Sequence, residues 1–544
     1  MKRLLMLLLP VLAAAQTVYL PVTHPVYRYL DKMEAKQFIA GYRDEVKPLS
    51  RTDVARFLAM IDTTSLPLSD VESDEQLFFK EEFFQELTRI GYENVIEERW
   101  SLYQYQSGTA LFNVNVNGGY AYRRRPDGTN TTVISNGGNV YGYVGSMIGA
   151  YFNLRDNRES GSHLDTVYRV PGVFAGTVSR PLTPEPAEAI ARNLFPRSYE
   201  YDPIDAQMNL DIAGAALSVE KMHNVWGTAE RGTIILSNKA PSYPQIKLRM
   251  PLGDDITFTY LHGWLHSNSM DSLRTYAVTG YGEPLTRVIF RQKYIAAHMV
   301  EFSLWDGVDI AIGESEIYGG RNPEVLYLIP FMFFKGAEHW MYDTDNSQMF
   351  MSADLNVVRD YNLYFSLFLD EFSTEDFYLS HRQRNQLAFT TGIRAYDLVM
   401  PDTRLTVEYT RLNPWVYNHK FPDATFQSHG VDLGHWLGQN GDLFFIQAQW
   451  QPMRSMTLAI QFESLRKGWK DSTVRQYQLP TPDFLYGPRT KSQSLGLTAR
   501  YEVLRDLFAD LWIQRSRYTS EADRGTADYA GEFDLFFSLR YNFY

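Results

Sequence analysis

The chain has 544 residues, a formal net charge of −12 and no cysteine. Without cysteine it can have neither a disulfide framework nor a thiolate metal site. The acidic balance argues against nucleic acid as a partner, and any polyanion that binds must find a local basic patch. Aromatic residues make up 15% of the chain, a share that suits both membrane-interface girdles and sugar-stacking surfaces.

The first 15 residues have the pattern of a secretory signal peptide. Lys2 and Arg3 precede the apolar run Leu4–Ala15, which ends in alanines suited to cleavage. This run is too short to cross a bilayer as a helix, and no later stretch approaches the roughly 20 apolar residues that a spanning helix needs. We therefore expect residues 1–15 to be removed on export and the mature chain to lack a helical anchor.

Residues 16–105 are predicted to form a small helical bundle. Pro25 suits the first position of one helix, and Ser50 can cap a second. Ser73 with Gln76 resembles a capping box that would start a third helix. Three short helices bury too little core to be stable alone, so we expect the bundle to pack against a larger domain.

From residue 106 to the C-terminus, apolar and polar residues alternate as they do in β-strands. In the second half, the expected hairpins have short turns and are separated by long loops at about 373–386, 411–441, 465–492 and 517–531. Bacterial outer-membrane barrels alternate in this way, with short turns in the periplasm and long loops outside. A soluble β-sandwich, the alternative for such strands, would not keep this alternation so regularly.

The last predicted strand, 533–543, has the clearest membrane pattern. Its apolar row would face lipid, and the polar row between would face a wet lumen. The apolar row consists of Phe533, Leu535, Phe537, Leu539, Tyr541 and Phe543.

Counting back from this strand gives eighteen strands, an even number that places both termini on the periplasmic side. The clearer candidates are 246–252, 256–266, 288–304, 308–318, 349–357, 363–372, 387–398, 404–410, 443–451, 456–463, 494–502, 507–516 and 533–543. The weaker candidates are 110–122, 138–154, 165–179, 207–222 and 230–237. The sequence therefore predicts an all-β transmembrane barrel of antiparallel strands over residues 106–544.

Several stretches resemble the capsule assembly Wzi family, outer-membrane barrel lectins of Gram-negative bacteria. They are His24–Leu30 with Pro48–Arg51, Ile312–Arg321 with Tyr327–Pro330, Leu367–Phe372, and Gly434–Asp442. They extend over nearly the full mature length, and none of them is a catalytic signature.

This resemblance implies a barrel of the same plan in the outer membrane of a diderm bacterium, with the helical bundle near its periplasmic end. It also implies a protein that holds capsular or exopolysaccharide at the cell surface, as a binding protein and not an enzyme. We expect no cofactor and no metal. The other expected partners are outer-membrane lipid and lipopolysaccharide, and the barrel assembly machinery during insertion.

Three adjacent arginines, Arg123, Arg124 and Arg125, precede a turn in the first predicted outer loop. Their guanidinium groups could pair bidentately with carboxylates or phosphates of an acidic glycan or of lipopolysaccharide. The alternative is a solvated loop tip that adds positive charge near anionic headgroups.

Two predicted outer loops combine flat rings with hydrogen-bond acceptors, as sugar sites do. The candidate ligand-binding residues are His339, Trp340, Tyr342, Asp343 and Asp345 in the first loop, and Trp415 and Trp436 in the second. In the alternative interpretation, these rings pack their own loops or join the outer aromatic girdle.

Charged residues near predicted strand ends could line the upper lumen. They are Glu314, Glu316, Arg321 and Asp370. Because charges that leave water are usually paired, we predict that these residues form a lumen charge network and not a ligand site.

No motif specifies catalysis or metal binding. His262 and His266 are four residues apart on a predicted strand, whereas this spacing suits metal ligands on a helix. Gly313–Ile317 lacks the second glycine of a nucleophile elbow. Two alternatives to glycan binding remain open: a porin-like channel or polysaccharide exporter, and an outer-membrane hydrolase whose serine and histidine meet only in the fold.

Overall fold

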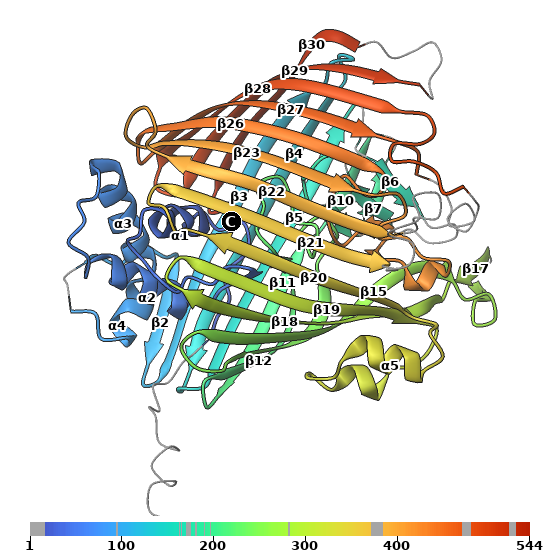
Figure 1. The fold of residues 1–544 in the computed structure, drawn as a ribbon, viewed down its shortest axis with the longest axis horizontal. Helices are drawn as coiled ribbons and strands as arrows, with labels where there is room; N and C mark the ends of the chain where they lie inside the picture. The colour runs from blue at the N-terminus through green and yellow to red at the C-terminus, as the bar shows by residue number, and fades with distance from the viewer. Residues whose placement is uncertain are drawn as a thin grey trace, which may run out of the picture.

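In the computed structural model, eighteen antiparallel strands close into a barrel with a helical domain at one end (Figure 1). The structure describes residues 17–543 apart from 94–95, 163, 165, 170–175, 180–181, 190, 196, 281–282, 372–384, 471–479 and 522–528. The predicted signal peptide lies outside the described residues. The barrel closes where β30 pairs with β3, with Tyr541 opposite Gly118.

The barrel strands run antiparallel to their neighbours around the whole ring. In chain order they are β3 (Ala110–Arg124), β4 (Asn130–Val144), β5 (Ile148–Gly161), β11 (Ile204–Ile212), β12 (Ala215–Met222), β14 (Tyr243–Pro251), β15 (Ile256–Met270), β18 (Phe290–Trp305), β19 (Val308–Gly319), β20 (Asn346–Leu355), β21 (Tyr361–Glu371), β22 (Gln386–Tyr396), β23 (Thr403–Leu412), β26 (Gly441–Met453), β27 (Met456–Lys467), β28 (Thr490–Leu504), β29 (Leu507–Ser520) and β30 (Tyr529–Tyr541).

Shorter strands extend the wall or lie off it. β2 (Tyr103–Ser107), β9 (Ala191–Phe195) and β10 (Ser198–Tyr201) are attached to the barrel sheet. The separate small sheets are β1 (Val46–Lys47) with β13 (Val225–Trp226), β6 (Thr166–Arg169) with β7 (Gly176–Ser179) and β8 (Glu188–Ala189), β16 (Tyr276–Gly280) with β17 (Glu283–Arg287), and β24 (Gln427–Ser428) with β25 (Val431–Asp432). Outside the helical domain, the helices among the described residues are η1 (Val325–Leu328), α5 (Phe334–Trp340) and η3 (Pro422–Ala424).

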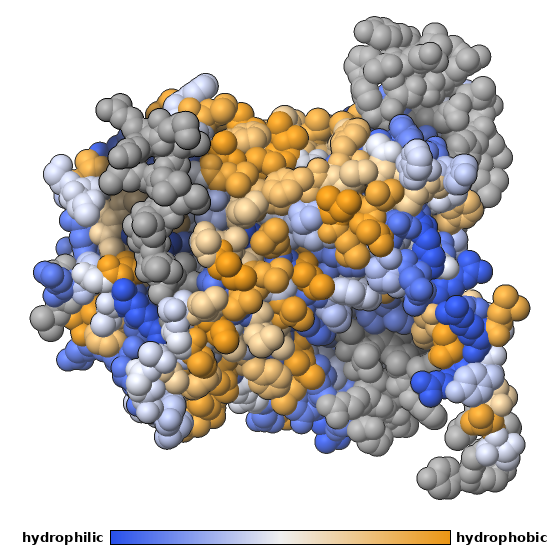
Figure 2. Space-filling view, turned by 90° about the horizontal axis from the view of Figure 1, so that it is seen from below, coloured by the Kyte–Doolittle hydropathy of each residue, from blue (hydrophilic) through white to orange (hydrophobic). Residues whose placement is uncertain are grey.

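The outer face of the wall is apolar and the inner face is polar. Along β30, Phe533 and Phe537 are 59% and 40% exposed, whereas Asp534 and Ser538 are buried. This is the alternation of a wall with lipid on one side and a lumen on the other. Figure 2 shows the resulting apolar band across the middle of one face, with polar residues gathered at both ends. The predicted transmembrane barrel is confirmed.

The total of eighteen strands is also confirmed. The weaker candidate 110–122 corresponds to β3, whereas the other four weaker candidates were misplaced. Candidates 165–179 and 230–237 are not barrel strands, while 138–154 and 207–222 each contain a turn and belong to two strands. The turn at Ala213–Gly214 has φ values of 51° and 88°, the left-handed pair of a two-residue hairpin. Alanine is not a typical turn residue, so the alternating pattern gave no sign of this turn. Residues 207–222 were therefore predicted as one strand instead of two.

The helical domain contains α1 (Val26–Ala35), α2 (Arg51–Ile61), α3 (Asp70–Glu82) and α4 (Phe84–Arg89). Ser50 caps α2 as predicted, because its hydroxyl accepts the backbone N–H of Asp53 at 3.0 Å. The capping box of α3 starts at Ser69, one turn before the predicted Ser73. Within the described residues, no helix has the length and apolar character needed to cross a membrane.

The helical domain lies at the short-turn end of the barrel, where the chain also ends (Figure 1). Its own core includes Leu30, Leu58 and Phe83, all fully buried. The long connections lie at the opposite end, which we call the long-loop end.

Candidate functional site

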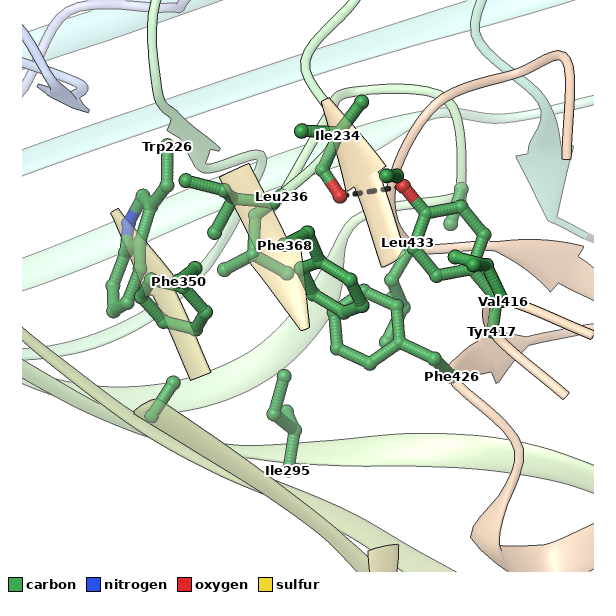
Figure 3. Close-up of a cluster of buried hydrophobic side chains, with 14 of the residues drawn as sticks. Trp226, Ile234, Leu236, Ile295, Phe350, Phe368, Val416, Tyr417, Phe426 and Leu433 are labelled. Carbon is green, nitrogen blue, oxygen red and sulfur yellow. Dashed lines mark hydrogen bonds between the residues drawn. The ribbon is translucent and has the colours of Figure 1, made fainter. Parts of the chain in front are cut away.

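A segment of the chain fills part of the barrel lumen. Residues 223–242, between β12 and β14, leave the wall and fold inward, so that Trp226 and Leu236 are buried inside the barrel (Figure 3). They belong to one apolar cluster with Phe350 and Phe368 of the wall. Because burying each large apolar side chain contributes about 1.5–3 kcal/mol, the segment is held as a packed core.

A second segment, residues 413–440 between β23 and β26, packs on the first. The Tyr417 hydroxyl donates to the Ile234 carbonyl at 2.5 Å (Figure 3). The rings of Tyr417 and Phe426 stack with their centroids 5.4 Å apart. We call residues 223–242 and 413–440 together the lumen plug.

The helical domain occupies the mouth of the barrel at the short-turn end. β1 pairs with β13, which joins this domain directly to the lumen plug. At the rim, Lys36 pairs with Asp397 at 2.5 Å and Arg99 pairs with Asp506 at 2.8 Å. The bundle therefore packs against the barrel as expected, and the lumen is occupied from both ends.

A cavity of about 420 Å³ lies between the lumen plug, the helical domain and the wall from β22 to β30. Inward-facing rings, amides and guanidinium groups line this lumen cavity. They include Phe445, Phe508, Trp512, Phe536, Gln447, Gln449, Gln461, Arg404, Arg500 and Arg540. Its volume is in the range of small-ligand sites, which use such rings together with a few polar groups.

The helical domain forms the floor of the lumen cavity. The Phe78 ring of α3 lies 4.5 Å from the guanidinium carbon of Arg454 and 4.4 Å from that of Arg505. Trp512 and Phe536 lie opposite each other on β29 and β30, several residues from the short turns. These two rings therefore lie farther toward the long-loop end than the Phe78 ring of the floor.

A buried ion-pair cluster forms the plug side of the cavity. Glu230 of the plug accepts a hydrogen bond from Arg404 at 2.9 Å and lies 3.5 Å from Arg394. Glu408 accepts the backbone N–H groups of Glu230 and Arg231 at 2.5 and 3.0 Å. Burial alone would raise the pKa of Glu230, but the charges of Arg404 and Arg394 outweigh it and lower this pKa to about 2. Ionised Glu230 thus fixes the plug to the wall.

The structure separates the three arginines singled out in the sequence. Arg123 points into the lumen, where it pairs with Asp534 at 2.7 Å and lies 5.6 Å from the Trp512 ring. Arg124 points outward and is exposed. The Arg125 guanidinium donates to the Thr131 hydroxyl of β4, across its own hairpin, at 2.7 Å. The expected guanidinium cluster does not form, because successive strand residues face opposite sides of the wall.

The first aromatic group spans the end of α5 and the residues after it, with His339 and Trp340 in the helix itself. This helix packs on the outer wall of the barrel over β15, β18 and β19. Four of the group's candidate residues are exposed there: His339, Trp340, Tyr342 and Asp343. Asp345 is buried and accepts a hydrogen bond from Arg321 at 2.5 Å. Arg321 therefore lies beside α5 on the outer wall and is not part of a lumen charge network. Exposed rings on the outer wall favour the girdle interpretation.

The expected lumen charge network is also wrong for Glu314 and Glu316, which lie on the outer face of β19. The backbone N–H of Phe334 donates to Glu314 at 2.7 Å, and the Ser347 hydroxyl donates to Glu316 at 2.5 Å. Ile317, on the other face, belongs to the lumen core. The two glutamates continue the lipid-facing row of β19, and α5 covers them.

The remaining candidates belong to the lumen plug and its anchor. Asp370 points inward from β21 and accepts the backbone N–H of Tyr417 at 2.6 Å. Trp415 and Trp436 are only 2% and 7% exposed. Their rings therefore pack the plug, which was the alternative considered from the sequence.

Sequence reasoning missed the lumen cavity, although a signal was present. Along β26 a row of amides alternates with an apolar row: Gln447, Gln449 and Gln451 against Ile446, Ala448 and Trp450. Amides facing a lumen and apolar side chains facing lipid give this pattern. Within the part of the chain that the structure describes, no group of three or more His, Asp or Glu side chains could hold a metal ion.

The fold and the site define a plugged transmembrane β-barrel with a helical domain in one mouth. The family model for capsule assembly protein Wzi matches residues 155–528. The chain belongs to this family. No curated protein sequence matches it.

Several solved structures align with the chain. Wzi, described as an outer membrane protein involved in group 1 capsule assembly in Escherichia coli and a carbohydrate binding β-barrel, aligns with a TM-score of 0.57 and 12% identity, covering 97% of this chain and 100% of its own. OprD from Pseudomonas aeruginosa aligns with a TM-score of 0.40 and 12% identity, over 79% of this chain and 93% of its own. OccAB2 from Acinetobacter baumannii aligns with a TM-score of 0.42 and 7% identity, over 80% and 99%.

Proposed function

We propose that this protein binds capsular or exopolysaccharide at the surface of the outer membrane and does not chemically alter it. The observation that carries the proposal is the occupied lumen, because a barrel filled from both ends is suited to holding a ligand and not to passing solutes. Membership of a capsule assembly family supports the same role. The lumen plug argues against the porin-like and exporter alternatives.

The proposal also fixes the orientation of the chain. Residues 1–15 direct export, the bundle within residues 16–105 faces the periplasm, and the barrel of residues 106–544 places its long loops outside. The barrel assembly machinery inserts the chain. Short turns toward the periplasm and long loops toward the exterior are the usual arrangement of such barrels.

The lumen cavity is the proposed glycan site. Trp512, Phe445 and Phe536 offer flat apolar faces for the CH faces of sugar rings, while Gln447 and Gln449 offer donors and acceptors for hydroxyls. The helical domain covers the floor of the cavity. A glycan segment therefore enters from the long-loop end, which is the side on which surface polysaccharide lies.

Replacing Trp512 with alanine is expected to weaken binding of the polysaccharide extracted from the producing strain by about tenfold or more, since losing a buried aromatic contact commonly costs over 1 kcal/mol. Calorimetric titration of the full chain in detergent measures the effect. Leu511→Ala is the matched control, because Leu511 is the adjacent residue, faces outward and is 40% exposed. If the W512A and L511A variants bound the polysaccharide with equal affinity, the lumen cavity would not be the glycan site.

The cellular role has its own test. Deleting the gene should shift surface polysaccharide from the cell-bound fraction to the medium, and the full chain supplied in trans should reverse this shift. If retention on the cell is unchanged by the deletion, the protein does not hold the polysaccharide.

A further inference from the structure

We propose that the outer face of β27–β29 carries a second binding site, for the phosphate groups of a phosphorylated glycolipid in the outer leaflet. Its cations are Arg466, Lys491, Arg515 and Arg517, and we call this group the basic belt. The site lies on the opposite side of the wall from the lumen cavity. The two binding sites can therefore be tested independently of each other.

The strand register brings the basic belt together. Arg466 on β27 lies directly opposite Lys491 on β28, and Gln493 on β28 lies opposite Arg517 on β29. Arg515 is two residues from Arg517 on the same face of β29 and is opposite Leu495. The Lys491, Arg515 and Arg517 side chains are exposed, and that of Arg466 is 51% exposed.

The basic belt begins where the lipid-facing surface ends. Going toward the long-loop end of β28, the large apolar or aromatic residues of the outer face are Val503, Tyr501, Leu497 and Leu495, each at least 47% exposed. Gln493 and Lys491 follow them on the same face. The run from Val503 to Leu495 extends roughly 27 Å along the strand. With a strand tilt of about 40°, this corresponds to roughly 20 Å across the membrane, so the cations lie at the level of the headgroups.

The positive charge of the belt is only partly balanced by protein. Arg466 pairs with Asp442, which also accepts the Tyr409 hydroxyl at 3.0 Å. Among the described residues, Lys491, Arg515 and Arg517 have no ion-pair partner. Like charges directly opposite each other on adjacent strands, such as Arg466 and Lys491, are destabilising. A bound anion would relieve this repulsion.

The surface is also hollowed at the belt. A groove of about 390 Å³ is lined by Arg466, Lys491, Gln493 and Arg517 together with Ser464 and Thr519. Its hydroxyl and amide groups supply neutral hydrogen bonds, and its guanidinium groups match the geometry of phosphate oxygens. A second hollow of about 410 Å³ adjoins it and shares Ser464, Arg466 and Gln493.

The location selects a lipid as the source of the phosphate. The groove faces the bilayer directly above apolar wall and does not open on the lumen, where a free glycan would meet the protein. A glycolipid can place acyl chains along Leu495 and Leu497 and its phosphates among the cations at the same time. Juxtamembrane basic clusters bind anionic headgroups in this way.

The test uses the full chain in detergent and diphosphoryl lipid A as the probe, with binding quantified by native mass spectrometry. The triple variant K491Q/R515Q/R517Q should weaken binding by at least about tenfold, because each cation near an anionic headgroup adds to the attraction. The matched control R274Q/R291Q/K420Q removes the same charge from exposed cations of the long-loop end and should bind like the wild type. Heat-modifiable migration on gels verifies that each variant is folded, and the double variant K491Q/R517Q serves if the triple variant is not.

The same titration distinguishes the sources of phosphate. Lipid A without its phosphates should bind much more weakly, and millimolar inorganic phosphate should not displace the diphosphoryl form. Unchanged affinity of the folded belt variants would overturn the proposal. Equal loss in the control, equal binding of phosphate-free lipid A, or ready displacement by inorganic phosphate would each overturn it as well.

Discussion

Replacing Phe368 with alanine is expected to release the lumen plug while leaving the barrel closed. Phe368 is fully buried, and its ring lies 5.2 Å from those of both Tyr417 and Phe426. Removing such a ring from a packed core costs about 3–5 kcal/mol. Hydrogen exchange of residues 223–242 and 413–440 should accelerate by about a hundredfold or more, since every 1.4 kcal/mol changes an equilibrium tenfold.

A matched control is available on the same strand. Leu363 faces outward from β21 and is 47% exposed, so Leu363→Ala should leave exchange in the plug unchanged. Amides of the barrel strands should remain protected in both variants, because the wall hydrogen bonds do not involve either side chain. If Phe368→Ala and Leu363→Ala gave the same plug protection, the segments would not be held by this core.

Replacing Arg404 with alanine is expected to destabilise the protein more than any single change on the outer wall. The change leaves Glu230 buried without its closest cation, and breaking a buried pair in this way typically costs about 3–5 kcal/mol. The double variant Arg404→Ala/Glu230→Gln should recover much of the loss, because it removes the stranded charge. Thermal unfolding in detergent compares the wild type, the single variant and the double variant. If Arg404→Ala were as stable as the wild type, Arg404 and Glu230 would not form a stabilising buried ion pair.

The same ion pair sets an acid limit on stability. The pKa of Glu230 is about 2 in the folded chain against 4.5 for an ordinary glutamate, so its stabilising contribution is complete above pH 4.5. It is lost as the pH falls from there toward 2, where the folded state also takes up the proton. Over that range the stability difference between the wild type and Glu230→Gln should shrink.

Much of the wall could be predicted because each barrel strand has one face toward lipid. The row from Phe533 to Tyr541 is apolar on that face whatever the lumen contains, and the same constraint identified the strands from residue 246 onward. The early strands gave a weaker signal. Two-residue turns such as Ala213–Gly214 interrupt the chain without interrupting the alternation.

The candidate site could not be predicted to the same degree. Whether a residue near a strand end faces the lumen cavity depends on which loops fold into the barrel and which cover its outer wall. Trp415 and Trp436 have the composition of a sugar site but pack the plug, because their loop turns into the barrel. Glu314 looked like a lumen residue but lies under α5 on the outside. The sequence does contain the amide row of β26, which is the one direct indication of the lumen cavity.

The central claim is that the plug and the helical domain leave no continuous path through the barrel. Single-channel recording of the full chain in planar lipid bilayers tests this most directly. We predict a flat baseline at neutral pH with no steady open level. Long-lived conductance steps of porin size from the unmodified protein would contradict the account and would favour a channel over a binding protein.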